Sequence, residues 1–95
     1  MEKEKIRQIV IETFNEYYDE DYKLLEITNN STQINYAILS KGDGIIVDFW
    51  VSNYSIFEAK SSQNLLNSIY KVKTWLAFIT TTEERLRQER DKENA

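Results

Sequence analysis

The sequence predicts a single α+β domain, an antiparallel sheet of three or four strands with two helices on one face and a charged helical tail. Three observations lead to it. Apolar residues recur at helical spacing near both ends of the chain, the middle alternates apolar and polar residues, and turn sequences separate the alternating segments. A chain of 95 residues has room for one hydrophobic core. Residues 1–82 are therefore expected to form the domain and residues 83–95 the tail.

The first helix is predicted over residues 2–18. Its apolar and small residues recur at steps of three and four and form one stripe, expected in the core: Ile6, Ile9, Val10, Thr13, Phe14 and Tyr17. Three acidic residues follow at positions 19–21. Negative charge is unfavourable at the C-terminal end of the helix dipole, so the helix is expected to end before them.

Four strands are expected in the middle of the chain, over residues 22–28, 33–39, 45–51 and 55–60. Alternation places Leu25 and Ile27 on one face of the first strand. In the second strand Ile34, Tyr36 and Ile38 share one face. Turns separate the strands at residues 29–31, 41–44 and 52–54, where asparagine or glycine adopts left-handed backbone conformations readily.

The second helix is expected to begin at Ser61 or Ser62, either of which can cap it. Aliphatic residues keep helical spacing from Leu65 to Ile79, which favours a helix to about Ile79. Residues 75–82 are also rich in strand-forming residues, so a strand at that point stays an alternative.

The C-terminal tail is predicted to be a separate, solvated helix. Thr81 and Glu84 have the spacing of a capping box, which marks a helix start. Residues 83–94 contain a single aliphatic residue, Leu86, and otherwise mostly charged ones. Because so little apolar area is available for burial, we expect the tail to be dispensable for folding.

Composition excludes several classes of protein. The chain has neither cysteine nor histidine, which removes disulfides, serine triads, Cys–His dyads and the usual zinc hydrolases. Twelve basic residues against sixteen acidic ones give a net charge of −4, which disfavours nucleic acid and suits a basic protein surface. The charged N-terminus and the short apolar run at residues 75–79 predict a soluble, cytoplasmic protein without a membrane segment.

Whether two carboxylates lie opposite each other depends on how the third and fourth strands pair. A three-residue loop at residues 52–54 places Phe49 opposite Phe57 on the core face. The same register places Asp48 opposite Glu58 on the other face, with Trp50 and Ile56 beside them. Like charges in direct opposition are unfavourable, which suggests either a bound cation or a neutralising neighbour such as Lys60.

Asp48, followed by Glu58-Ala59-Lys60, resembles the D…ExK signature of restriction-endonuclease-like nucleases. The resemblance covers about residues 44–70 and includes Gln63, where some members carry a glutamine. It implies that Asp48 and Glu58 hold a divalent metal such as Mg²⁺ and that Lys60 assists the attacking water. The alternative is that these residues form a solvated face of the sheet.

A second resemblance lies in residues 46–52, Ile-Val-Asp-Phe-Trp-Val-Ser. This segment is similar to the strand of small phage or prophage proteins that carry a Val-Asp-Phe-Trp-Pro-Ser-Thr-Gly-Lys-Trp hairpin before an apolar helix. The chain departs from that pattern in the turn, at Val51, Asn53 and Tyr54. The resemblance implies an accessory protein of a phage or other mobile element, many of which bind and inhibit host machinery.

These features favour a small protein-binding module that docks on a host protein as an inhibitor or accessory protein, without a cofactor. The residues expected to bind lie on or next to the third and fourth strands: Asp48, Trp50, Tyr54, Ile56 and Glu58. The alternative is a minimal Mg²⁺-dependent nuclease that uses Asp48, Glu58 and Lys60. The identity of the partner and the oligomeric state stay open, and a homodimer is among the options.

Overall fold

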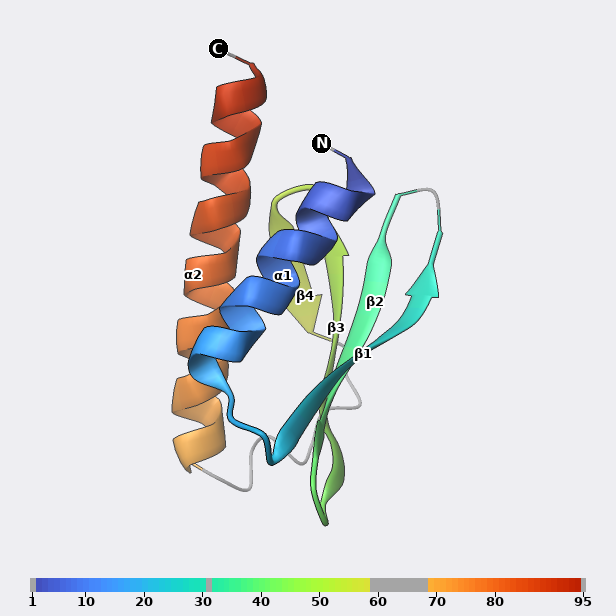
Figure 1. The fold of residues 1–95 in the computed structure, drawn as a ribbon, viewed down its shortest axis with the longest axis vertical. Coiled ribbons are helices and arrows are strands. Elements are labelled where there is room, and N and C mark those ends of the chain that lie inside the picture. Colours follow the sequence, from blue (N-terminus) through green and yellow to red (C-terminus); the bar gives the residue numbers. More distant parts are fainter. Residues whose placement is uncertain (1, 31, 59–68, 95) are drawn as a thin grey trace.

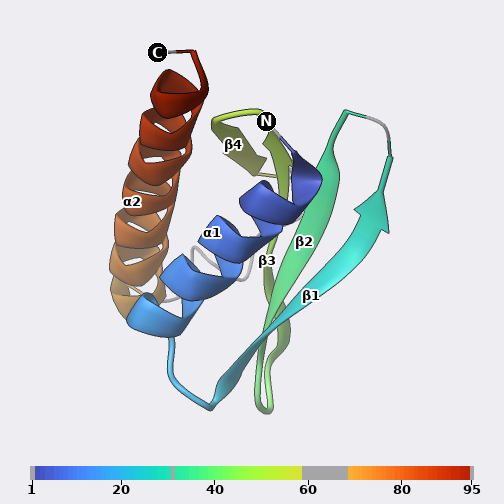
Figure 2. The same ribbon diagram turned by 45° about the horizontal axis from the view of Figure 1, so that its top comes forward.

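The computed structural model describes residues 2–30, 32–58 and 69–94, without the side chains of residues 69–72. Its elements follow in the order α1 (Lys3–Tyr17), β1 (Tyr22–Asn29), β2 (Ile34–Ser40), β3 (Gly44–Ser52), β4 (Ser55–Glu58) and α2 (Ile69–Glu93). The four strands form one antiparallel sheet in sequence order, and both helices lie on the same side of it (Figures 1 and 2). The predicted α+β class is confirmed. Neither described helix has an apolar stretch long enough to cross a membrane.

Helix α1 buries the predicted stripe except at its last position. Ile6, Ile9, Val10, Thr13 and Phe14 are buried. The placement of Tyr17 in the core was wrong, because the helix ends there and Tyr17 is exposed. Tyr18 has extended backbone angles and takes the core position, with its ring stacked on Phe14 at a centroid distance of 5.0 Å.

The sheet turns one face toward the helices. As predicted, Ile34, Tyr36 and Ile38 of β2 share a face, and all three are buried in the core. Their partners on β3 are Val51, Phe49 and Val47, which are buried on the same side. A bulge between Ile38 and Leu39 and another between Glu26 and Thr28 interrupt the ladders.

The register of β3 with β4 differs from the prediction. Ser52 pairs with Ser55, so the loop has two residues, and Asn53 adopts the left-handed conformation that it requires (φ 56°). Phe49 consequently lies opposite Glu58. The predicted pairs Phe49–Phe57 and Asp48–Glu58 were therefore wrong.

Helix α2 is continuous through the threonines at which a break was predicted, so the capping box at Thr81–Glu84 and the strand alternative for residues 75–82 were wrong. The buried side chains continue at helical spacing from Trp75 through Phe78 and Thr82 to Leu86. Leu86 is fully buried, so the C-terminal turns of α2 contribute to the core and are not a solvated tail. The predicted helix start at Ser61 or Ser62 lies outside the described residues.

Polar contacts fix α2 against α1. Arg85 donates hydrogen bonds to both carboxylate oxygens of Glu16, at 3.0 Å to Oε1, and to Thr13 Oγ1 at 3.0 Å. The hydrogen bonds from Arg85 lower the pKa of the Glu16 carboxyl below its ordinary value. The Tyr17 hydroxyl lies 2.6 Å from Thr81 Oγ1, so Tyr17 contacts α2 outside the core.

Candidate docking face of the sheet

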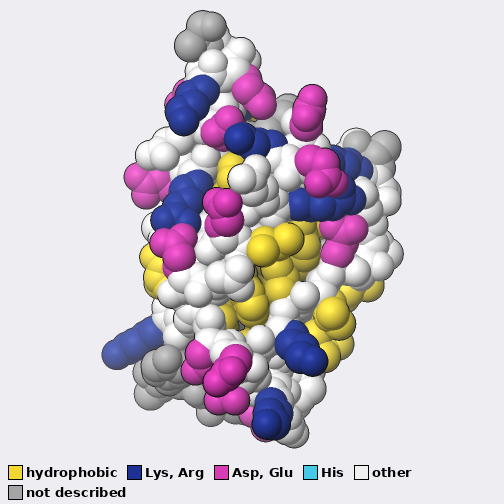
Figure 3. All heavy atoms as spheres, in the orientation of Figure 1, with side chains coloured by type: hydrophobic (Ala, Val, Ile, Leu, Met, Phe, Trp, Pro, Cys, Tyr) yellow, Lys and Arg dark blue, Asp and Glu magenta, His cyan; other side chains and the backbone are white. Residues whose placement is uncertain are grey.

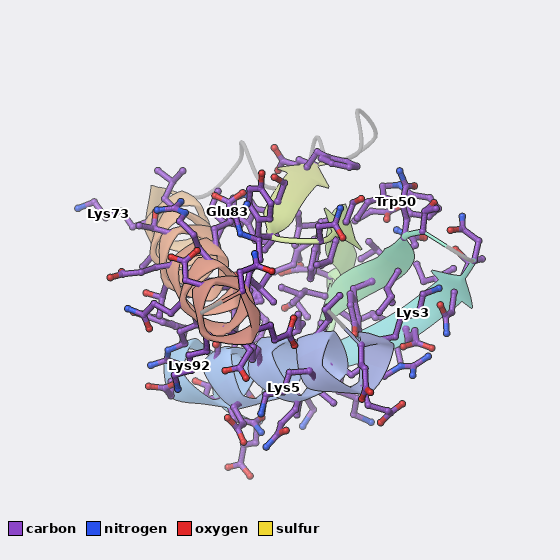
Figure 4. The ribbon with its side chains drawn as sticks, turned by 90° about the horizontal axis from the view of Figure 1, so that it is seen from above. Lys3, Lys5, Trp50, Lys73, Glu83 and Lys92 are labelled. Atoms are coloured by element: carbon purple, nitrogen blue, oxygen red, sulfur yellow. The ribbon has the colours of Figure 1, made fainter. Side chains whose placement is uncertain are left out.

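The face of the sheet turned away from the helices carries no other helix or strand among the described residues (Figures 2 and 4). We call it the outer face. The strand registers place ten side chains on it in three rows from β4 or β3 to β1: Phe57, Trp50, Asn35 and Thr28; Asp48, Ala37 and Leu25; Ile45, Leu39 and Lys23. The outer face therefore combines residues from all four strands.

Large apolar side chains on the outer face are open to solvent. Leu25 is 48% exposed, Ile45 50% and Phe57 44%. Ile27, at the bulge of β1, is 47% exposed. Ala37 and Asn35, at the centre of the face, are buried, so the exposed apolar side chains lie around its margin. Single exposed apolar residues are ordinary on a protein surface, but several around one face are typical of a contact surface.

Trp50 lies in the same cross-strand row as Phe57, which is its direct partner on β4. Its indole is directed away from the helices (Figure 4) and is half-buried. Directly opposed residues in an antiparallel pair have Cβ atoms about 4.5–5.5 Å apart. Trp50 and Phe57 are therefore cross-strand neighbours at the β4 end of the outer face.

A polar residue lies in the same row as Trp50 and Phe57. Asn35 of β2 is buried, and its Nδ2 donates to Asp48 Oδ1 at 2.6 Å and to the carbonyl oxygen of Phe49 at 2.9 Å. Asn35 therefore holds the Asp48 carboxylate in a fixed position within a mainly apolar surface. Sequence reasoning missed Asn35, although a lone amide within the apolar strand Ile34–Ser40 is a signal of this kind.

The structure separates the five predicted binding residues. Asp48 and Trp50 lie on the outer face. Ile56 pairs with Val51 and packs against the core, so its placement beside Trp50 was wrong. Tyr54 lies in the β3–β4 loop, with the Arg90 guanidinium 4.1 Å from its ring centroid.

Glu58 and Asp48 are on opposite faces of the sheet. Glu58 pairs with Phe49, and neighbouring residues of a strand point to opposite faces, so Asp48 points the other way. Lys60 lies outside the described residues. Within the described part of the chain, no three acidic side chains are grouped in a way that would hold a metal ion.

The side of the molecule that carries the helices has a different surface. Acidic and basic side chains are interspersed over α1 and α2, and apolar side chains gather between α1 and the strands (Figure 3). Several charges are paired, as Lys5 is with Glu89 at 3.6 Å and Arg7 with Glu26 at 2.7 Å. These pairs connect α1 to its neighbours α2 and β1, so the charged groups contribute to the packing of the helix side.

Comparison of the chain with protein-family models, with curated proteins and with solved structures gives no match.

Proposed function

We propose that the protein is a small protein-binding module that docks on another protein through the outer face of its sheet. The observation that carries the proposal is the exposure of Leu25, Ile45 and Phe57 on a face that no described element covers. Each of these side chains loses contact with water when a partner covers the face, and burial of apolar area drives association.

The neighbouring aromatic residues Trp50 and Phe57 support the same proposal. Aromatic side chains dominate the binding energy of many protein interfaces when a partner excludes water from them. Trp50 and Phe57 are adjacent on the outer face, and the placed carboxylate of Asp48 lies in the next row. The aromatic residues would supply affinity, and Asp48 would select a partner with a hydrogen-bond donor or a cation at the matching position.

A host protein is the class of partner we propose, and an accessory or inhibitory role encoded by a phage or other mobile element is the context. The support is the resemblance of residues 46–52 to small phage and prophage proteins. The Asp-Phe-Trp part of the resemblance falls on residues 48–50 of this chain, which include Asp48 and Trp50. A net charge of −4 favours the encounter with a basic partner surface.

We do not propose the nuclease alternative. A metal ion shared between Asp48 and Glu58 requires both carboxylates on one face, and the β3–β4 register puts them on opposite faces. Asp48 and Glu58 therefore cannot bind one metal ion together, as the D…ExK signature requires.

The test compares three single variants of the full chain. Phe57→Ser and Ile45→Ser alter the outer face, and Leu76→Ser alters an equally exposed leucine of α2 (52% exposed). Tagged proteins capture partners from extracts of the source cells, and the affinity of each identified, purified partner is then measured by calorimetry.

We expect Phe57→Ser and Ile45→Ser to weaken binding about tenfold or more, while Leu76→Ser leaves it unchanged. Circular dichroism and urea unfolding check that all three variants fold. Equal affinity of the outer-face variants and the original chain for every purified partner would contradict the proposal.

A further inference from the structure

The two edges of the sheet are treated differently. At one edge, β4 has only four residues and is contacted by α2. The backbone N–H of Ile56 donates to Glu83 Oε2 at 2.9 Å, and Figure 4 shows Glu83 on the side of α2 nearest β4. The Glu83 carboxylate thus accepts a hydrogen bond from a backbone N–H of the edge strand. Covering an edge with a helix is one way in which proteins keep it from pairing with another strand.

The other edge, β1, is long, and no described strand pairs with its outer side. It has eight residues and lies at the margin of the sheet (Figure 1). The N–H of Lys41 donates to the carbonyl of Asp21 at 2.9 Å, so the backbone of Asp21 faces β2. Because this direction alternates along an antiparallel strand, Leu24 and Glu26 direct their N–H and C=O groups away from the sheet.

The side chains next to this edge favour pairing with an apolar strand. Leu25 and Ile27 are both about half exposed. Of the features that usually protect such an edge, β1 has a lysine, Lys23, and a bulge, but it contains no proline and is twice as long as β4. The bulge between Glu26 and Thr28 limits regular pairing to the first five residues of β1, from Tyr22 to Glu26.

The charges indicate which end of the incoming strand is basic. Residues 19–21, directly before β1, are Asp-Glu-Asp, and all three are exposed. Three carboxylates against Lys23 and Lys41 leave this end of the edge net acidic. A second copy of the chain is disfavoured as the occupant, because each copy carries a net charge of −4.

We infer that β1 binds an extended segment of a partner protein as a fifth strand of the sheet. This inference rests on the proposed function and specifies how the partner binds. In this segment apolar residues alternate with polar ones, and the apolar residues lie beside Leu25 on the outer face. The end that lies beside residues 19–21 carries lysine or arginine. Main-chain hydrogen bonds to Leu24 and Glu26 provide affinity, as in other cases of strand addition.

The experiment pans a displayed library of random peptides, about eight residues long, against the folded full chain. In the enriched peptides, apolar residues are expected to alternate with polar ones, and one end is expected to be basic. Each is then synthesised with N-methyl groups on alternate amides, in two complementary sets. Because alternate amides of a strand point to opposite edges, one set should weaken binding on the order of tenfold and the other should not. Hydrogen exchange of the Leu24 and Glu26 amides should slow in the complex.

Failure to enrich any peptide, or equal tolerance of both methylation sets, overturns strand addition at β1. The effect of the acidic residues 19–21 is measured separately, by repeating the titrations at high salt, where the contribution of the basic end of the peptide should weaken. The outcome is distinct from failure of the proposed function: loss of the captured partner in Phe57→Ser still supports docking on the outer face. If peptides pair with β1 but Phe57→Ser still binds every partner, strand addition at β1 is supported and docking on the outer face is contradicted.

Discussion

Replacing Leu86 by alanine should destabilise the protein strongly, although the residue lies in a highly charged segment. Its side chain is 0% exposed in the core between the helices and the sheet. The substitution removes three carbon groups, worth about 2.4 kcal/mol at roughly 0.8 kcal/mol each. The cavity left behind raises the expected cost to about 2.5–5 kcal/mol. That is a large part of the roughly 5–15 kcal/mol by which small domains are stable.

Urea unfolding followed by tryptophan fluorescence measures this cost, since Trp75 is buried near the centre of the core. With a slope of about 1.5 kcal/mol per molar urea, a loss of about 3 kcal/mol lowers the midpoint by about 2 M. Leu76→Ala is the matched control: it makes the same change in the same helix at a side chain that is 52% exposed. The control should shift stability by no more than about 0.5 kcal/mol.

Equal midpoints for Leu86→Ala and the original chain would refute the reasoning, because they would mean that Leu86 is solvated. Truncation after Thr82 provides a second measurement. It removes Leu86 together with Glu83 and Arg85, which contact β4 and α1. The truncated chain is expected to lose its cooperative unfolding transition, and a transition unchanged from that of the full chain would show that the C-terminal turns are dispensable.

Three further outcomes are expected. Phe14→Ala should cost about 3–5 kcal/mol, because its buried ring packs on two other aromatic rings; an unmoved urea midpoint would contradict this. Glu16→Gln should lower stability at neutral pH, and the difference should disappear as the pH falls through the depressed pKa that Arg85 gives to Glu16 in the folded state; a difference that persists in acid would exclude this cause. Burial raises the pKa of Tyr36, so the folded state favours the protonated hydroxyl. The free energy of unfolding is therefore independent of this group below the pKa of an unfolded tyrosine, about 10, and falls as the pH rises from there through the folded-state value. Its buried hydroxyl has no hydrogen-bond partner among the described residues, so Tyr36→Phe should stabilise the protein by about 1 kcal/mol and weaken its alkaline destabilisation, both measured by urea unfolding.

Part of the candidate site was predictable because alternation along one strand is local information. Asp48 and Trp50 flank Phe49 in β3, so burial of Phe49 directs both of them to the outer face. Their neighbours depended on the loop length between β3 and β4. A loop shorter by one residue moved Phe57 to the outer face and Ile56 to the core, because a one-residue change in register reverses every side chain of the strand.

The sequence by itself determined the elements whose periodicity is strong: helix α1 with its buried stripe, strand β2 with its core face, and the overall α+β order. These follow from the spacing of apolar residues within one segment. The tertiary structure alone decided that α2 continues past Thr82 and that Leu86 is buried. Local propensity favoured a new helix start there, but burial against α1 and the sheet is an interaction between segments far apart in the chain, and its free energy exceeds that of a helix cap.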